Sequence, residues 1–155
     1  MGLYFDDITV GQEFRSNPRV LTQEDVNEFA DLTGDFNKLH LDSEYAKTTP
    51  FERPISHGLL VLSIALGQWY SLGITADSIV AFVGINNLSF KAPVYPGDNI
   101  SLKSIVVSKR ESKSKPDVGL VTIRDMMVNQ KGIVVLEFDR ILMLKKKQAR
   151  KANLQ

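Results

Sequence analysis

The first part of the chain repeats apolar residues with the period of a helix. Thr22 precedes this segment and Asp25 lies three residues on, which is the arrangement of a helix N-cap. Gly34 stands where a helix commonly ends in a left-handed residue. The pattern predicts a helix that begins after Thr22 and ends at Gly34, with residues 35–40 in a loop directly beyond it. The residues expected on its apolar or small face are Val26, Phe29, Ala30 and Thr33.

Two later segments are also helical in pattern. Residues 43–47 indicate one short helix, and Pro50 and Pro54 make a long helix after it unfavourable. Residues 59–70 are apolar nearly all round, as expected of a central helix enclosed by the rest of its domain. The large side chains of this segment are Leu59, Leu62, Leu66 and Trp69. We interpret them as core, and the alternative is that some of them line a ligand tunnel.

From residue 79 onward the pattern becomes that of strands. Runs rich in Val, Ile and Phe occupy residues 79–90, 99–109, 118–128 and 133–144. Residues 129–132 form a predicted hairpin turn, and residues 9–19 are expected to add one strand before the first helix. Helices followed by strands indicate the α+β class, with an antiparallel sheet wrapped around the apolar helix. Such a sheet has exposed edges, so we expect a homodimer or a dimer of dimers.

Length and composition fit a single domain. Of the 155 residues, 43% are apolar, which is enough for a proper core. We expect one domain over residues 1–144 and a basic C-terminal tail over residues 145–155, where lysine and arginine occur without any acid. Nothing else in the sequence resembles a nucleic-acid surface, so we interpret the tail as a solvated end and expect no nucleic-acid partner.

Several classes of protein and site are excluded. The chain contains no cysteine, which rules out disulfides, thiolate zinc sites and a cysteine nucleophile. With two histidines it cannot build a multi-histidine metal site, and we expect no metal. The longest apolar stretch, residues 59–66, is far shorter than the roughly 20 residues of a membrane span. Acids at the N-terminus replace the basic residues of a signal peptide, so we expect a cytoplasmic protein.

The candidate chemistry lies between Gly34 and Gly58. This stretch contains both histidines, His40 and His57, each just outside a predicted helix. Asp35 and His40 are five positions apart, and an acid and an imidazole at this spacing can hold one water between them. Gly58 opens a predicted helix, where its N–H can stabilise a developing oxyanion. The arrangement suggests addition of water to a polarised carbonyl compound.

Each of these residues also has a purely structural interpretation. Asp35 can cap the turn after the first helix, and Asn37 can be present because asparagine tolerates left-handed turns. His40 can fix its loop through hydrogen bonds, and His57 can position the start of the next helix. Gly58 can be glycine only because the packing there is tight.

Three stretches of the sequence carry a family resemblance. Residues 29–40 read FADLTGDFNKLH, residues 53–58 read RPISHG and residues 87–98 read NLSFKAPVYPGD. Together they resemble the hydratase motif and the downstream strand and turn of MaoC-like, (R)-specific enoyl-CoA hydratases. The resemblance implies a hot-dog fold, in which a curved antiparallel sheet wraps a long helix, usually paired as a homodimer.

The resemblance also implies roles for single residues. Asp35 and His40 fall on the catalytic pair of the family, and Gly58 falls on its oxyanion donor. Asn37 falls on a supporting residue of the catalytic loop, and His57 on the residue that precedes the donor.

The chain departs from the family pattern at two positions. Lys38 stands where the family usually has proline. Leu66 stands where family members often present a serine, while Ser63 lies about one turn earlier. These departures bear on the substrate range more than on the reaction.

The implied activity is reversible addition of water to a trans-2-enoyl-CoA to give a (3R)-3-hydroxyacyl-CoA. One residue of the pair Asp35 and His40 would take a proton from water while the other returns a proton to Cα, and Gly58 would stabilise the enolate. The only partner expected besides a second copy is the acyl-CoA substrate, with no cofactor. Two alternatives remain open, a hot-dog acyl-CoA thioesterase and a non-catalytic acyl-CoA-binding module.

Overall fold

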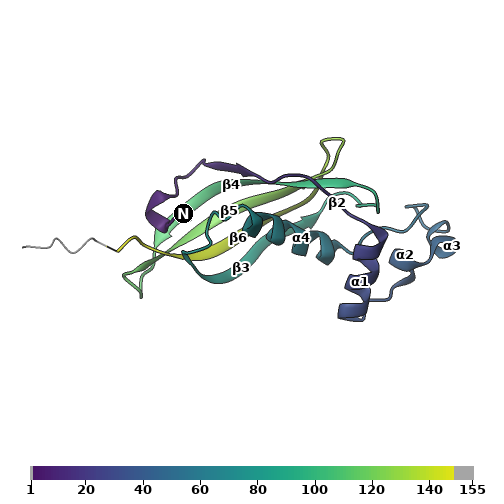
Figure 1. The fold of residues 1–155 in the computed structure, drawn as a ribbon, viewed down its shortest axis with the longest axis horizontal. Helices are drawn as coiled ribbons and strands as arrows, with labels where there is room; N and C mark the ends of the chain where they lie inside the picture. The colour runs from purple at the N-terminus through teal and green to yellow at the C-terminus, as the bar shows by residue number, and fades with distance from the viewer. Residues whose placement is uncertain (1, 149–155) are drawn as a thin grey trace, which may run out of the picture.

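The computed structural model describes residues 2–148 as a long curved sheet with one helix along it and three helices at one end (Figure 1). The elements in chain order are the 3₁₀ helix η1 (Phe5–Asp7), β1 (Glu13–Arg15), β2 (Arg19–Val20), α1 (Gln23–Thr33), α2 (Lys38–Leu41), α3 (Ser43–Ala46), α4 (Gly58–Ser71), β3 (Ile79–Phe90), β4 (Asn99–Glu111), β5 (Val118–Val128) and β6 (Val134–Lys145).

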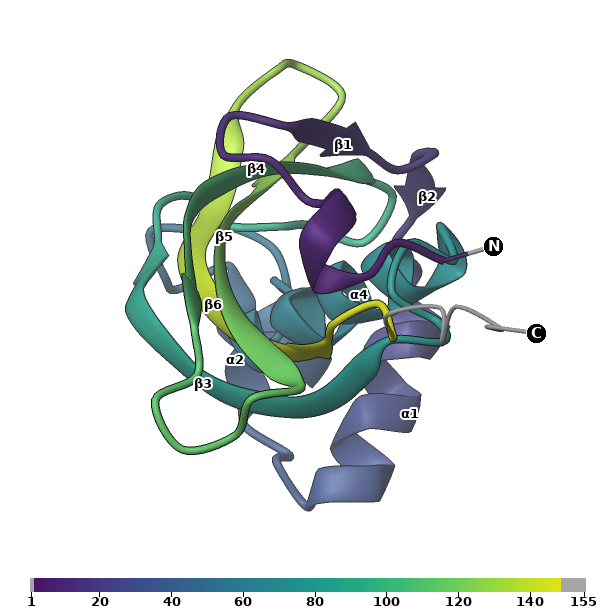
Figure 2. The ribbon, with the colours of Figure 1, turned by 90° about the vertical axis from the view of Figure 1, so that its left-hand side faces the viewer.

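The strands form an antiparallel sheet in the order β1-β4-β5-β6-β3, with β2 paired to β4. Figure 2 shows this sheet curling around α4, as the α+β prediction required. β3 lies at an edge of the sheet, and its pairing with β6 shifts register between Phe82 and Gly84 and again between Asn86 and Ser89. Irregularities of this kind bend a strand, which helps the edge to follow the curve of the sheet.

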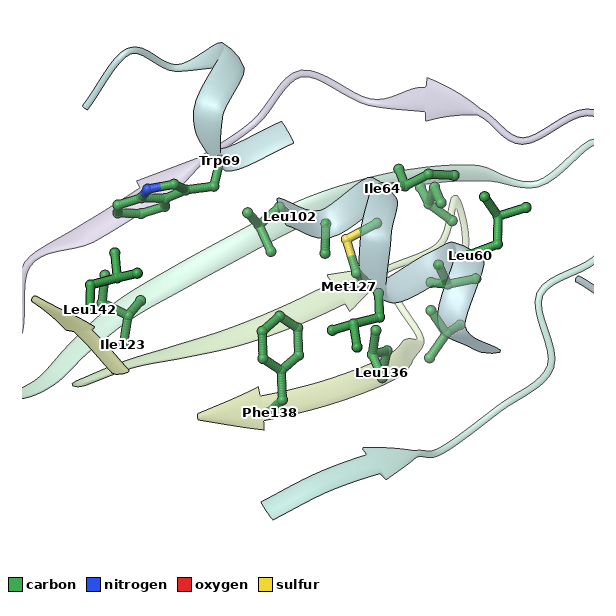
Figure 3. Close-up of a cluster of buried hydrophobic side chains, with 14 of the residues drawn as sticks. Leu60, Ile64, Trp69, Leu102, Ile123, Met127, Leu136, Phe138 and Leu142 are labelled. Atoms are coloured by element: carbon green, nitrogen blue, oxygen red, sulfur yellow. The ribbon is translucent and has the colours of Figure 1, made fainter. Parts of the chain in front are cut away.

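The core lies between α4 and the concave face of the sheet. Figure 3 shows Leu60, Ile64 and Trp69 from α4 in one cluster with Met127 and Phe138 from the strands, and all five are buried. Full burial of one such side chain stabilises the fold by roughly 1.5–3 kcal/mol. The apolar segment predicted as a central helix therefore packs against the sheet and contributes to the core.

A buried ion pair lies next to this core. Arg140 on β6 donates to Asp125 on β5 at 2.7 Å, and both side chains are almost fully buried. Ser104 donates to the same carboxylate, and the Arg140 guanidinium lies 4.3 Å from the centre of the Trp69 ring. Burial raises the pKa of Asp125, while Arg140 and Ser104 oppose that rise. No feature of the sequence predicted this pair.

The expectation that α4 is enclosed on every side is wrong for part of the helix. Leu59 is 57% exposed and Tyr70 is 43% exposed. The sheet curls around one side of α4 only, so the opposite side remains open in a single chain. Leu66 is partly buried and packs against the core, while the exposed Ser63 donates its hydroxyl to the carbonyl of Leu59.

Local chemistry explains the ends of α1. The hydroxyl of Thr22 accepts from the N–H of Asp25, and the carboxylate of Asp25 accepts from the N–H of Thr22, which is a full capping box. Gly34 ends the helix with φ 79°, in the left-handed region. Both predicted ends are confirmed.

Two predicted segments differ from the structure. The loop predicted over residues 35–40 contains the beginning of α2, because Asn37 caps a short helix there. The single strand predicted over residues 9–19 is divided into β1 and β2, with Pro18 between them. Proline has no N–H to contribute to a strand ladder, which accounts for the interruption.

The chain beyond β6 begins with ion pairs. β6 itself includes Lys145, the first residue of the predicted tail, and Lys146 then pairs with Glu111 at 2.8 Å. Lys147 pairs with Asp7, and this contact lowers the pKa of Asp7. The rest of the predicted tail lies outside the described residues. Within residues 2–148, no helix is both long and apolar enough to cross a membrane.

Candidate active site

Three side chains singled out from the sequence meet near the N-terminal end of α4. Asp35 follows the end of α1, His40 lies on α2, and His57 is the N-cap residue of α4. The nitrogen and oxygen atoms that they present lie within 4.8 Å of one another. The fold therefore brings the predicted acid and imidazole together and adds the second imidazole beside them.

The backbone fixes the tautomer of His40. Nδ1 of His40 lies 2.7 Å from the carbonyl oxygen of Ile55, and a carbonyl can only accept, so Nδ1 carries the proton. Burial lowers the pKa of His40; the nearby His57 acts in the same direction, while Ile55 and Asp35 oppose it. The neutral imidazole is thus favoured, with a lone pair on Nε2.

His57 is buried and contacts both Asp35 and His40. Its Nε2 lies 3.0 Å from the backbone carbonyl of Asp35, to which it donates. Its ring lies 3.9 Å from the ring of His40 and 4.9 Å from that of Phe29, measured between centroids. Among the described residues, Nδ1 of His57 has no hydrogen-bond partner. The side chain of His57 makes no cap hydrogen bond to α4, so it positions the backbone at Asp35 and not, as considered from the sequence, the start of the helix.

Asp35 and Asn37 also bind the backbone of their own loop. Oδ1 of Asp35 accepts from the N–H of Asn37 at 3.3 Å, and Oδ1 of Asn37 accepts from the N–H of Leu39 at 3.0 Å. The structural interpretation of Asp35 is therefore present in the fold. That of Asn37 is not, because its φ of −56° is not left-handed and the residue caps α2 instead. The Asp35 side chain is nevertheless 51% exposed, and its Oδ2 lies 4.0 Å from Nε2 of His57. One carboxylate oxygen is left open to a water.

Gly58 is the first residue of α4, so its N–H belongs to the first turn and has no acceptor inside the helix. A Cβ at this position would lie only 2.5, 2.7 and 3.1 Å from three atoms of the Phe90 ring. The packing interpretation of Gly58 is thus also correct, because the aromatic ring leaves no room for a side chain. It does not compete with use of the N–H as a donor.

A cavity of about 450 Å³ begins at Gly58 and His40. Phe51 and Ile55 from the loop before α4 line it, as does Leu59 on the exposed side of α4. Val61, Phe90, Ala92, Pro93, Val94, Val135 and Leu136 complete its apolar walls, and the polar residues Ser56 and Lys91 also line it. The site can therefore place an apolar group beside an imidazole and a free backbone N–H.

The cluster of Asp35, His40 and His57 has the dimensions of a metal site, but its hydrogen bonds favour proton chemistry. Nδ1 of His40 and Nε2 of His57 both carry protons for backbone carbonyls. A cation would have to use the remaining nitrogen of each ring, and that of His57 is buried.

The family model described as "MaoC like domain" matches residues 7–126. The chain belongs to the MaoC-like family. An (R)-specific enoyl-CoA hydratase of Aeromonas caviae is 35% identical over 137 residues, which are 88% of this chain and 96% of that protein. A β-methylmalyl-CoA dehydratase of Chloroflexus aurantiacus is 32% identical over 147 residues, which are 94% of this chain and 41% of that protein. These relatives support a hydratase or dehydratase function in general.

A solved structure agrees on the fold. A Mycobacterium tuberculosis protein described as a double hot-dog fold matches with a TM-score of 0.84 and 27% identity, over 97% of this chain and 46% of that one. The hot-dog fold implied by the sequence resemblance is confirmed. Lys38, a departure from the MaoC-like pattern, is the first residue of α2. Proline is favoured at this position of a helix but not required, so α2 forms without it.

Most of the cavity wall was not identified from the sequence. Val135 and Leu136 lie on β6, far along the chain from the motif, and resemble any other core residues. Phe90 lies inside the third stretch that carries the MaoC-like resemblance. That resemblance was the one feature of the sequence that could have indicated Phe90 as part of the cavity wall. Of the four large residues on the central helix, Leu59 lines the cavity, whereas Trp69 is core.

Proposed function

We propose that the protein adds water reversibly to a trans-2-enoyl-CoA and forms a (3R)-3-hydroxyacyl-CoA. One observation carries the proposal: His40 keeps Nε2 unprotonated, because Nδ1 donates to Ile55, at the mouth of an apolar cavity that begins at Gly58. The hydratase of Aeromonas caviae acts on enoyl-CoA with (R) specificity, which supports both the reaction and its stereochemistry.

In the proposed reaction, Asp35 and His40 hold one water. His40 takes a proton from it through Nε2 while the oxygen bonds to Cβ of the enoyl group. The electron pair of the double bond moves toward Cα and the thioester oxygen. Nε2 of His40 then returns this proton to Cα, which leaves the site unchanged, and the reverse sequence removes water. Proton transfers to and from positioned groups typically contribute ~10²–10⁴ in rate.

Gly58 would stabilise the charge on the thioester oxygen. Its N–H lies at the positive end of the α4 dipole and has no intrahelical acceptor. Loss of one oxyanion donor typically lowers turnover about 10²–10³-fold. This role uses only the backbone, so it does not conflict with the tight packing of Phe90 on Gly58.

The proposed reaction uses the chain and acyl-CoA alone, without metal or redox cofactor. We expect EDTA to leave the rate unchanged.

We further propose that two copies pair through β3. This edge strand exposes large apolar side chains, which an isolated soluble chain rarely does on this scale: Val80, Phe82, Val83, Leu88 and Phe90. Sedimentation of the wild type against a Val83→Lys variant tests this, and a monomeric wild type would contradict it.

The first experiment follows loss of the enoyl absorbance of crotonyl-CoA. Wild type is compared with Asp35→Asn and His40→Ala, and with Asp31→Asn, a change of the same kind at an exposed residue of α1. We expect turnover by wild type and Asp31→Asn and at least a ~10²-fold loss in the other two. Full activity of either site variant would contradict the proposed roles.

The other two functions give different results. A thioesterase would release free thiol from saturated acyl-CoA. A binding module would bind acyl-CoA tightly without turnover, and replacement of Asp35 would leave that binding unaffected.

A further inference from the structure

The cavity beside the candidate active site contains little that could bind a charge. Its deeper walls are the buried side chains of Val61, Val94, Val135 and Leu136. Its outer part adds aromatic and aliphatic side chains such as Phe51 and Leu59. An acyl chain that enters from the thioester site therefore meets hydrocarbon along most of its length.

Each polar side chain of the cavity is already engaged by another group. The hydroxyl of Ser56 donates to the carbonyl of His57 at 3.1 Å, and Nδ1 of His40 donates to Ile55. Nζ of Lys91 lies 3.0 Å from a carboxylate oxygen of Glu137. Among the described residues that line the cavity, no cation is left unpaired.

We infer that the acyl group accepted here is an uncharged hydrocarbon and that a second carboxylate is excluded. The inference rests on the proposed hydratase function and narrows its substrate class. A carboxylate moved into this cavity would lose its water without gaining a cation, and unpaired buried charge is strongly unfavourable. The Chloroflexus relative is named for β-methylmalyl-CoA, whose acyl group carries a second carboxylate, so acceptance of a charged acyl group is the alternative to be tested.

The test compares two thioesters that differ at one position. Pent-2-enoyl-CoA ends in a methyl group, and trans-glutaconyl-CoA has a carboxylate in place of that methyl. We expect kcat/KM for hydration to be roughly 10²–10³ lower for glutaconyl-CoA, the size typical of one uncompensated buried charge. Equal values for the two thioesters would overturn the inference and leave the hydratase function intact. Hydration of neither would overturn the hydratase function itself.

Two comparisons, one between variants of Leu59 and one between wild type and a Lys91 variant, identify the cause of the preference for the uncharged thioester. Leu59→Arg places a cation at the cavity, and Leu59→Gln is its uncharged control at the same exposed position. We expect Leu59→Arg, and not Leu59→Gln, to raise the relative kcat/KM of glutaconyl-CoA at least tenfold. Lys91→Gln should leave the preference of the wild type unchanged. If wild type hydrates glutaconyl-CoA well and Lys91→Gln loses this, then Lys91 exchanges Glu137 for the substrate carboxylate and the inference is wrong.

Discussion

Replacement of Gly58 separates two reasons for a glycine at the start of α4. A Cβ built there would lie 2.5 Å from the nearest atom of the Phe90 ring, well inside contact distance. Gly58 has helical backbone geometry and no left-handed φ, so the obstacle to a side chain is the ring. Overpacking in a core typically costs about 1–3 kcal/mol, and the half-exposed Phe90 ring can move toward solvent, which places the cost at the lower end. We therefore expect Gly58→Ala to be destabilised by about that amount and to lose activity through displacement of Phe90.

Removal of the ring should reverse this effect. Phe90 is 54% exposed in one chain but belongs to the β3 face proposed to pair two copies, so Phe90→Ala is measured first as the reference for stability and turnover. Because alanine keeps its N–H, the double variant Gly58→Ala/Phe90→Ala should regain the stability and most of the turnover of Phe90→Ala. Thermal unfolding and crotonyl-CoA hydration measure the two properties separately. A double variant that is stable but inactive would show that the substrate itself needs the glycine, and the argument from Phe90 would be refuted.

The Phe90→Ala variant also provides a background in which the backbone N–H of Gly58 can be tested as a donor. Proline is tolerated at the first position of a helix and lacks an N–H. The preceding residue, His57, has φ −56° and ψ 133°, which suits a residue before proline. Gly58→Pro/Phe90→Ala should therefore fold like the alanine pair and turn over about 10²–10³ more slowly. Equal turnover by the two pairs would remove Gly58 from the proposed mechanism.

Four further changes test the site and the fold. Protonated His40 cannot accept a proton from water. Because the pKa of His40 is lowered, kcat/KM should fall on acidification only at a pH below 6.5, the ordinary pKa of histidine. Asp35→Asn removes a charge that raises the pKa of His40, so the acid limb of the residual activity should move to still lower pH. Lys38→Pro should raise the unfolding free energy in urea by ~0.4–1 kcal/mol, since the Lys38 N–H has no acceptor among the described residues; a loss of stability would contradict this. Arg140→Met leaves Asp125 buried and unpaired and should cost about 3–5 kcal/mol in the same assay, whereas an unchanged midpoint would show that the pair is dispensable.

The parts of the fold that were predictable depend on neighbours in the sequence. The ends of α1 follow from Thr22, Asp25 and Gly34, whose roles need only the adjacent backbone. The long strands follow from apolar runs bounded by turns. The short helix α2 was missed because four residues are too few to show a helical period, and only Asn37 marks its start.

The site was predictable for the same reason, and only in part. Asp35 and His40 are separated by five positions, so a local motif was enough to suggest that they act together. The contact of His57 with both depends on where α4 begins in space, and the wall formed by Val135 depends on β6. Contacts between distant segments leave no pattern in residue types, since a core valine and a cavity valine look alike in a sequence.

The two histidines together explain why an acid is needed beside them. Opposite nitrogens are committed to backbone carbonyls, Nδ1 of His40 to Ile55 and Nε2 of His57 to Asp35. Burial is the main cause that disfavours a proton on His40 before reaction, and His57, whose ring lies 3.9 Å away, acts in the same direction. When His40 takes a proton from water, the nearby carboxylate of Asp35 offsets that cost. In the proposed reaction, burial thus keeps the base neutral at rest, with a smaller contribution from His57, and Asp35 stabilises the charge that appears during turnover.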